Sequence, residues 1–177
     1  MLAAFFAIII FAVAADITTK ILTFGKTIAF IPGFIRFESV RNEGMVWGMM
    51  NGVNGFVAVI SVVTALVTAI LLAVFFKYRG KMSKGIQIGL AMIIGGAIGN
   101  LIDRVSLGFV RDFICTEFIN FPVFNVADIF VTCGAILLGV LLVFTKNGHE
   151  LFAAIFPDEK KAEKAAETEE NAKEISD

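Results

Sequence analysis

The stretch from Phe56 to Phe76, FVAVISVVTALVTAILLAVFF, decides the fold class, because it is 21 residues long and contains no charge. A helix needs about 20 apolar residues to cross the ~30 Å hydrocarbon core of a bilayer. Two further uncharged apolar stretches follow, Gly85 to Ile102 and Ile129 to Thr145. With 58% hydrophobic residues in 177, the composition argues against a water-soluble globule. The sequence therefore predicts several membrane-spanning helices.

A shorter apolar stretch opens the chain, from Leu2 to Ala15, and its end resembles a signal-peptide cleavage site. It lacks the basic region that precedes such a signal, and continuing it to Leu22 gives a full-length span, so we favour an uncleaved first helix. The predicted fold is an all-α membrane protein with a small extracytoplasmic β-containing cap. Its four transmembrane helices are expected at about residues 1–22, 56–76, 85–104 and 126–145, and its cap at residues 23–55.

Charge distribution predicts the orientation of these helices. Four basic residues crowd the short link from Lys77 to Lys84, which marks the cytoplasmic side and places both termini there. In the cap, a partly alternating run from Phe34 to Arg41 predicts one or two short strands. Residues 1–149 then form the membrane domain. Residues 150–177 carry nine acidic and four basic side chains and are expected to be a cytoplasmic tail that is disordered or a solvated helix.

The remaining composition excludes several classes of function. A net charge of −1 gives no electrostatic basis for a nucleic-acid partner. With two cysteines and one histidine, the chain lacks the residues for a disulfide scaffold, a Cys/His zinc site or a Cys-His nucleophile. We expect two unpaired thiols, packed as small hydrophobes, and no metal or cofactor.

Charged and amide side chains gather near the predicted outer ends of the helices, where each charge costs about 2.5–3.5 kcal/mol to insert. Asp16 and Lys20 stand four residues apart on one helix face, so we expect an ion pair. Asp103 and Arg104 are neighbours, which diverge by roughly 100° around a helix, so each needs a partner elsewhere. The other members of the group are Asn100, Asn125 and Asp128.

Two carboxylates, Asp112 and Asp128, have no basic side chain three or four residues away. If they lie close together in a partly dry site, they cannot both ionise cheaply and will share one proton. That arrangement is typical of aspartic hydrolases, in which one carboxylate activates water and the other polarises the scissile carbonyl without a metal. The alternative is two aspartates solvated at the membrane interface.

Glycines in the third predicted span have a simpler interpretation. Gly95, Gly96 and Gly99 imitate a nucleotide-binding loop, but no strand precedes them. Gly85/Gly89 and Gly95/Gly99 are instead G-x-x-x-G pairs, which favour close approach of neighbouring helices.

Five short segments, in this order, resemble the motifs of lipoprotein signal peptidase (signal peptidase II), the bacterial aspartic peptidases of family A8. They are DITTK from Asp16, NEGMVWG from Asn42, GGAIGNLIDR from Gly95, VRDFI from Val110 and FNVAD from Phe124. Together they extend from the first predicted span to the last.

The resemblance implies that Asp112 and Asp128 are the catalytic pair of an endopeptidase in the bacterial inner membrane, with its active site near the outer face. The implied substrate is a prolipoprotein whose cysteine already carries diacylglycerol, cleaved on the amino side of that cysteine. The resemblance also implies membrane lipids and the inhibitor globomycin as partners. Departures at Ile17, Trp47 and Ile129 bear at most on substrate preference. Site-orienting or substrate-binding roles are implied for Asp16, Lys20, Asn42, Gly44, Asn100, Asp103, Arg104 and Asn125.

Two other functions compete with this one. Intramembrane carboxylates also serve proton-coupled carriers, although carriers usually place their sites at the bilayer midplane between repeated halves. No repeat is visible here, and the middles of the last three spans hold no charge. A membrane scaffold that uses its G-x-x-x-G faces gives no reason for the polar clusters.

Overall fold

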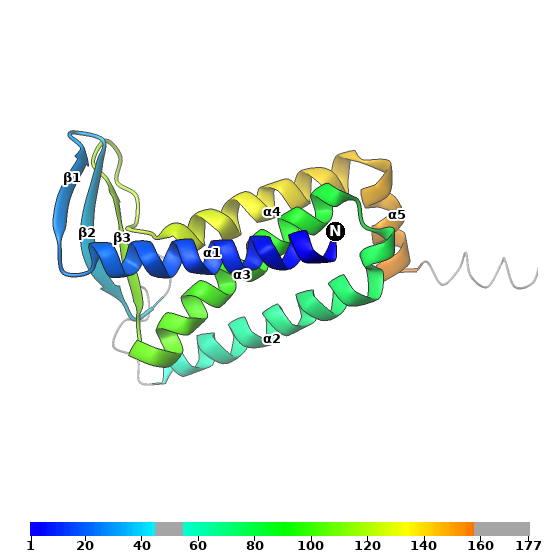
Figure 1. The fold of residues 1–177 in the computed structure, drawn as a ribbon, viewed down its shortest axis with the longest axis horizontal. Coiled ribbons are helices and arrows are strands. Elements are labelled where there is room, and N and C mark those ends of the chain that lie inside the picture. The colour runs from blue at the N-terminus through cyan, green and yellow to red at the C-terminus, as the bar shows by residue number, and fades with distance from the viewer. Residues whose placement is uncertain (45–54, 158–177) are drawn as a thin grey trace, which may run out of the picture.

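The computed structural model describes residues 1–44 and 55–157. Four long helices run side by side along its longest axis: α1 (Leu2–Thr23), α2 (Phe56–Tyr78), α3 (Lys84–Leu107) and α4 (Val126–Phe144) (Figure 1). Each is long and apolar enough to cross a membrane. The first helix continues unbroken beyond Asp16, as the sequence predicts. The mostly helical fold with four candidate membrane helices therefore agrees with the sequence analysis.

Helix α3 packs against the other three long helices, and its glycines explain how closely they approach. A Cβ at Gly95 would lie 2.7 Å from the Cβ of Ala12 on α1. A Cβ at Gly96 would collide with the carbonyl oxygen of Ala127 on α4, and one at Gly89 would lie 3.1 Å from the carbonyl oxygen of Gly134. The close helix packing expected from the G-x-x-x-G pairs is confirmed.

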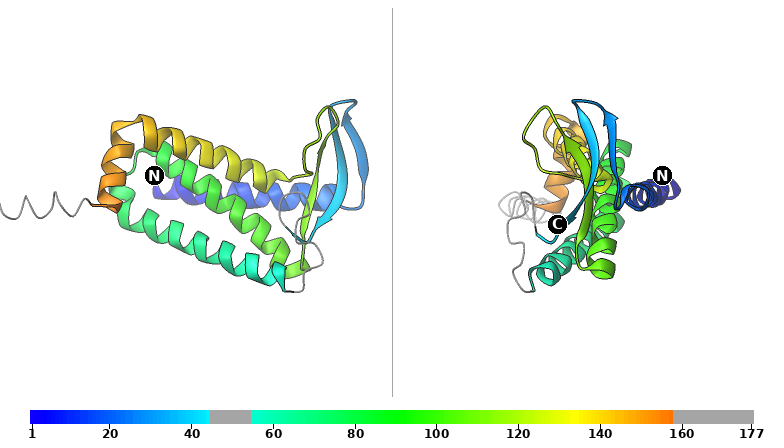
Figure 2. Two further views of the ribbon diagram at one scale, coloured as in Figure 1. Left: turned by 180° about the vertical axis from the view of Figure 1, so that it is seen from behind. Right: turned by 90° about the vertical axis from the view of Figure 1, so that its left-hand side faces the viewer.

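A three-stranded antiparallel sheet covers one end of the bundle (Figures 1 and 2). Strands β1 (Thr27–Ile31) and β2 (Ile35–Asn42) form a hairpin whose turn uses Gly33 at a φ of 77°. The third strand, β3 (Val110–Thr116), pairs with β2 over registers such as Ile35 with Thr116. The sequence analysis predicted no strand in this segment, because nothing local signals a pairing between residues so far apart.

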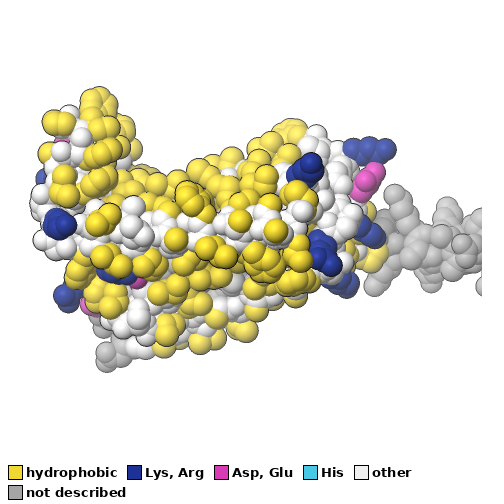
Figure 3. All heavy atoms as spheres, viewed as in Figure 1, with side chains coloured by type: hydrophobic (Ala, Val, Ile, Leu, Met, Phe, Trp, Pro, Cys, Tyr) yellow, Lys and Arg dark blue, Asp and Glu magenta, His cyan; other side chains and the backbone are white. Residues whose placement is uncertain are grey.

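The sheet has two chemically different faces. Ile28, Phe30 and Phe37 line an apolar cavity of about 420 Å³ together with residues at the outer end of α1. On the opposite face of β2, Arg36 and Glu38 form a partly exposed ion pair of 2.8 Å. Hydrophobic side chains accordingly gather on the side of the sheet that faces the bundle (Figure 3). Period-two alternation in β1 and β2 thus turns apolar groups toward the helix ends.

The opposite end of the bundle carries a short helix, α5 (Lys146–Ile155), and a group of basic side chains; other basic side chains lie at the sheet end (Figures 1 and 3). Asn147 joins α5 to the link between α2 and α3: its Nδ2 donates to the carbonyl of Lys81 at 2.8 Å, and its Oδ1 accepts from the Ser83 N–H at 2.7 Å. Leu151 is buried. The start of the expected acidic tail is therefore a packed helix, and its continuation from residue 158 lies outside the described residues.

Candidate active site

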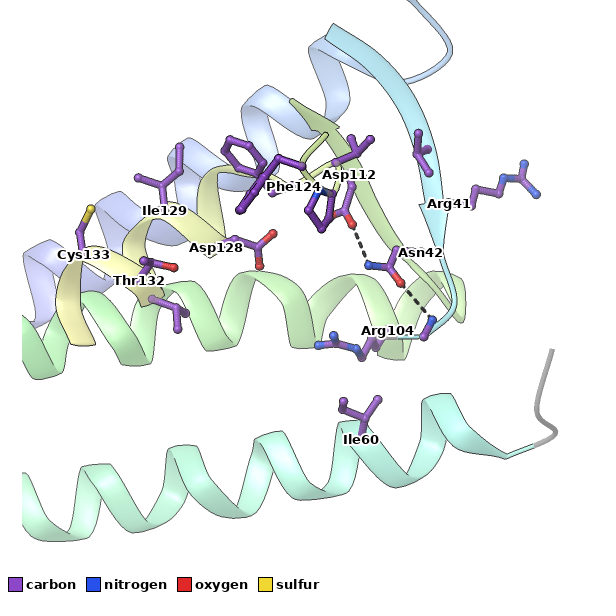
Figure 4. A pocket seen from close by; sticks show the side chains of 16 residues that line it. Arg41, Asn42, Ile60, Arg104, Asp112, Phe124, Asp128, Ile129, Thr132 and Cys133 are labelled. Atoms are coloured by element: carbon purple, nitrogen blue, oxygen red, sulfur yellow. Dashed lines mark hydrogen bonds between the residues drawn. The ribbon is translucent and has the colours of Figure 1, made fainter. Parts of the chain in front are cut away.

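A cavity of about 770 Å³ opens where the sheet meets the helix ends (Figure 4). Its wall combines β2, β3, α3 and α4, and it also reaches Ile60 of α2. Asp112 enters it from β3 and Asp128 from the first turn of α4. The structure therefore brings together the two carboxylates that the sequence analysis singled out.

Asp112 is almost completely buried, with 3% of its surface exposed. Its Oδ1 accepts from Asn125 Nδ2 at 2.6 Å and its Oδ2 from Asn42 Nδ2 at 2.8 Å. Burial raises the pKa of Asp112 to about 6; the negative charge of Asp128 adds to the rise, and the hydrogen bonds from Asn42 and Asn125 oppose it. Asp112 is thus a carboxyl group that keeps a proton into the mildly acidic range.

Asp128 is half-buried and belongs to the capping box that begins α4. Its Oδ2 accepts from the Asn125 N–H, and its own N–H donates to Asn125 Oδ1, both at 3.0 Å. The remaining oxygen, Oδ1, accepts from Asn100 Nδ2 at 2.8 Å. Such reciprocal bonds at a helix N-terminus satisfy N–H groups that lack partners within the helix.

Asn125 connects the two carboxylates. Its side chain donates to Asp112, while its backbone N–H donates to Asp128. The residue before it, Phe124, is held against β3, because its carbonyl accepts from the N–H groups of Phe113 at 3.0 Å and Ile114 at 2.8 Å. Strand β3 and the start of α4 are therefore fixed to each other at the point where the two aspartates meet.

Asn42 and Gly44 approach Asp112 from the end of β2. The Gly44 N–H donates to Asn42 Oδ1 at 3.0 Å, which turns the amide nitrogen of Asn42 toward Asp112. Both residues line the cavity. The rest of the NEGMVWG segment, including Trp47, lies outside the described residues.

Behind the cavity lies a buried ionic cluster. Lys20 Nζ is 2.7 Å from Asp16 Oδ2 and 3.3 Å from Asp103 Oδ2, and all three side chains are fully buried. The predicted Asp16–Lys20 pair is confirmed, and Asp103 finds the distant partners it was expected to need. Asp16 also reaches α4, where its Oδ1 accepts from the Ala127 N–H at 2.9 Å. The cluster thus fixes α1 to the start of α4.

The sequence analysis gave no role to Arg111, which completes this cluster. Its Nη2 donates to Asp103 Oδ1 at 2.6 Å, and its backbone N–H donates to Asp103 Oδ2 at 2.9 Å. Arg111 immediately precedes Asp112, so Asp103 fixes the start of β3. The position of Arg111 next to Asp112 in the VRDFI segment was the only sign in the sequence that Arg111 could belong to the site.

Arg104 lies on the α3 wall of the cavity, and Figure 4 shows its side chain directed toward the side where Asp128 lies. The sequence analysis did not identify Arg41, Ile60, Thr132 or Cys133 as lining residues. Side chains scattered over β2, α2 and α4 give no pattern that a single sequence reveals. Cys133 and Cys115 are both free thiols, as expected. Only Cys115 is packed in the interior, whereas Cys133 is exposed, so the expected packing is wrong for Cys133.

Metal ligation has little support in the part of the chain that the structure describes. Within residues 1–44 and 55–157 there is no group of three or more His, Cys, Asp or Glu side chains that could hold a metal ion. The groups that converge on the two aspartates are amide donors and cations. They suit anionic carboxylates or the oxygens of a bound peptide.

Fold and site together define a helical membrane protein with a pair of carboxylates in a cavity at one end of its bundle. Residues 8–144 match the family model described as signal peptidase (SPase) II. The lipoprotein signal peptidase of Enterococcus faecalis is 38% identical over 131 residues, covering 74% of this chain and 79% of that protein. The chain belongs to the signal peptidase II family. It is therefore a peptidase and a multi-pass bacterial membrane protein.

Other relatives agree. The lipoprotein signal peptidase of Staphylococcus haemolyticus is 33% identical over 145 residues, covering 81% of this chain and 89% of that protein. A solved structure described as a bacterial membrane enzyme superimposes with a TM-score of 0.73 at 31% identity. The match covers 81% of this chain and 89% of that one. The family resemblance in the five sequence segments is confirmed.

Proposed function

We propose that this protein is an aspartic endopeptidase that removes the signal peptide from diacylglyceryl-modified prolipoproteins, using Asp112 and Asp128 to activate water. The relatives named above act on lipoproteins, which supports the substrate class. The observation that carries the proposal is the pair itself: two carboxylates line one cavity, and Asn125 is bonded to both.

In the proposed mechanism one carboxylate is ionised and the other holds a proton. The ionised group takes a proton from water as the water oxygen attacks the scissile carbonyl carbon, while the protonated group hydrogen-bonds to the carbonyl oxygen. The tetrahedral intermediate collapses when the C–N bond breaks and the leaving amine receives a proton. No covalent enzyme intermediate or metal takes part.

The cavity suits a substrate that is itself part of a membrane. Its volume lies within the range of about 300–1,000 Å³ typical of ligand sites, and Ile60, Ile129 and Val131 contribute apolar wall. We place the sheet and cavity at the outer face of the inner membrane and both termini in the cytoplasm. The four basic residues in the short link from Lys77 to Lys84, at the other end of the bundle, support this orientation. Signal helix and acyl chains then approach from within the bilayer.

The proposal is tested with detergent-purified protein and a lipidated precursor, without added metal. We expect a product shortened to the lipidated cysteine, and we expect globomycin to inhibit its formation. An unlipidated precursor is the matched control and should be cleaved far more slowly. Proton-coupled uptake into proteoliposomes without precursor cleavage would instead favour a carrier.

The raised pKa of Asp112 predicts the pH dependence of cleavage. Because this carboxyl group holds its proton up to about pH 6, the pair loses its shared proton as the pH rises through that value. Because this pKa belongs to the protein without substrate, we expect kcat/KM to fall on the alkaline side, with a limb centred near pH 6, and to fall again when a second proton binds in more acidic solution. Initial rates from pH 4 to 9 measure this, and a flat profile between pH 5 and 8 contradicts the shared proton.

A further inference from the structure

Three asparagines present their amide nitrogens to the two aspartates. Asn42 and Asn125 donate to Asp112, and Asn100 donates to Asp128, over distances of 2.6–2.8 Å. An amide has a donating and an accepting end, so rotating any of the three by half a turn would place an oxygen against a carboxylate oxygen. The site therefore depends on something that holds each amide in its present orientation.

Each amide oxygen accepts from a donor that fixes this orientation. For Asn42 the donor is the backbone N–H of Gly44, and for Asn125 it is that of Asp128, both at 3.0 Å. Asn100 Oδ1 instead accepts from two side chains, Lys20 Nζ and Asn125 Nδ2, both at 2.9 Å. At Asn100 alone of these three, the amide is fixed by a cation that a substitution can remove.

The ammonium group of Lys20 is well suited to this task. It has three N–H donors and no acceptor, and the structure supplies three oxygens: Asp16 Oδ2 at 2.7 Å, Asn100 Oδ1 at 2.9 Å and Asp103 Oδ2 at 3.3 Å. Its side chain is fully buried, so water does not compete. Because the ammonium cannot accept a hydrogen bond, only the oxygen end of Asn100 can face it.

We propose that Lys20 is a positioning residue that fixes the Asn100 amide so that its nitrogen donates to Asp128. Lys20 does not line the cavity, and its hydrogen-bonded route to the Asp128 carboxylate runs through Asn100. Its positive charge also opposes the rise in the pKa of Asp112, which is why the test below separates hydrogen bonding from charge. The contribution of this residue to turnover rests on the proposed function, since the orientation of Asn100 affects the rate only if Asp128 takes part in hydrolysis.

A single Lys20→Met change would leave Asp16 facing Asp103 without the cation between them, and the protein would be destabilised for that reason alone. The test therefore uses an Asp16→Ala background, which removes one of the two carboxylates and leaves Lys20 in contact with Asn100 and Asp103. Asp103 keeps its bonds to Arg111. Into this background we place Lys20→Met, Asn100→Ala, and the two together, which completes a double-mutant cycle.

If Lys20 acts through Asn100, its loss matters only while Asn100 is present. We expect Lys20→Met to lower kcat about tenfold or more when Asn100 is intact, as expected for a misplaced catalytic group. With Asn100→Ala already in place, the same change should lower kcat less than about twofold. The KM for the lipidated precursor should stay within about twofold throughout, because ground-state binding is unchanged.

A second comparison separates hydrogen bonding from charge. Lys20→Gln in the same background removes the charge as Lys20→Met does but restores a neutral N–H donor, so it should recover part of the lost kcat. Melting temperatures in detergent identify variants that fail to fold. Equal fractional losses of kcat with and without Asn100, in folded variants, overturn the proposal, and so does an effect confined to KM.

Failure of this inference can be told apart from failure of the proposed function. If Asp128→Asn still cleaves the precursor, the proposed function falls whatever the cycle shows. If Asp128→Asn is inactive and the cycle is additive, only the role given to Lys20 falls.

Discussion

Replacing either Asp112 or Asp128 with asparagine is expected to lower kcat for a lipidated precursor by about 10³-fold or more, as for other groups that act directly on the reacting atoms. An amide cannot take a proton from water or give one to the scissile carbonyl, although it has nearly the shape of a carboxyl group. Initial rates of product formation by the purified variants, at a saturating precursor concentration, measure the effect.

Folding must be shown to survive these changes. Asp112→Asn removes a buried carboxylate at the cost of placing an amide NH₂ against the donors of Asn42 or Asn125, so we expect a small shift in melting temperature. Glu38→Gln is the matched control, because Glu38 belongs to the same sheet but lies partly exposed beside Arg36 and does not line the cavity; its kcat should equal that of the unmodified protein. Turnover above about a tenth of normal in either Asp variant contradicts the paired-carboxylate mechanism.

Gly96→Ala is expected to destabilise the fold by about 1–3 kcal/mol, the usual cost of adding a methyl group to a closely packed interior. The added Cβ would collide with the carbonyl oxygen of Ala127 and lie 2.8 Å from Val131 Cγ2. Backbone atoms cannot move aside as a flexible side chain can. Because Ala127 directly precedes Asp128, we also expect kcat to fall. Thermal unfolding in detergent and initial rates measure the two effects.

Gly139→Ala is the control for Gly96→Ala. Gly139 lies in the same pair of packed helices, on α4, but a Cβ there would meet no atom within 4 Å. Alanine favours a helix over glycine by up to about 1 kcal/mol, so the melting temperature should hold or rise. Equal losses of stability in the two variants would show that helix packing at Gly96 is looser than the structure indicates.

The sequence predicted the features that are encoded locally. Long apolar runs identify the four helices, because a membrane sets their length, and a four-residue spacing identifies the Asp16–Lys20 pair. The contacts that join distant segments could not be predicted from the length of a run or from the spacing of residues. Strand β3 exists because it pairs with β2, and Lys20 meets Asn100 across 80 positions of sequence. Neither spacing nor composition records such pairings.

The family resemblance supplied the names of ten site residues without their connections. It placed Asp16, Lys20 and Asn100 in one undivided group, whereas the structure separates the amides that contact the aspartates from the ionic cluster behind them. It also omitted Arg111, whose bonds to Asp103 hold the strand that carries Asp112. Helix α5 was missed because it is short and adjoins an acidic segment that resembles a solvated tail.

Asp112 lies on strand β3 and Asp128 on helix α4, so the site is formed at the junction of these two elements. Backbone hydrogen bonds between Phe124 and strand β3 hold the two elements together at this point. Asn125 donates a hydrogen bond to each of the two carboxyl groups and so connects them across this junction. The spacing of the two carboxyl groups is therefore a property of this junction, and neither the strand nor the helix determines it alone.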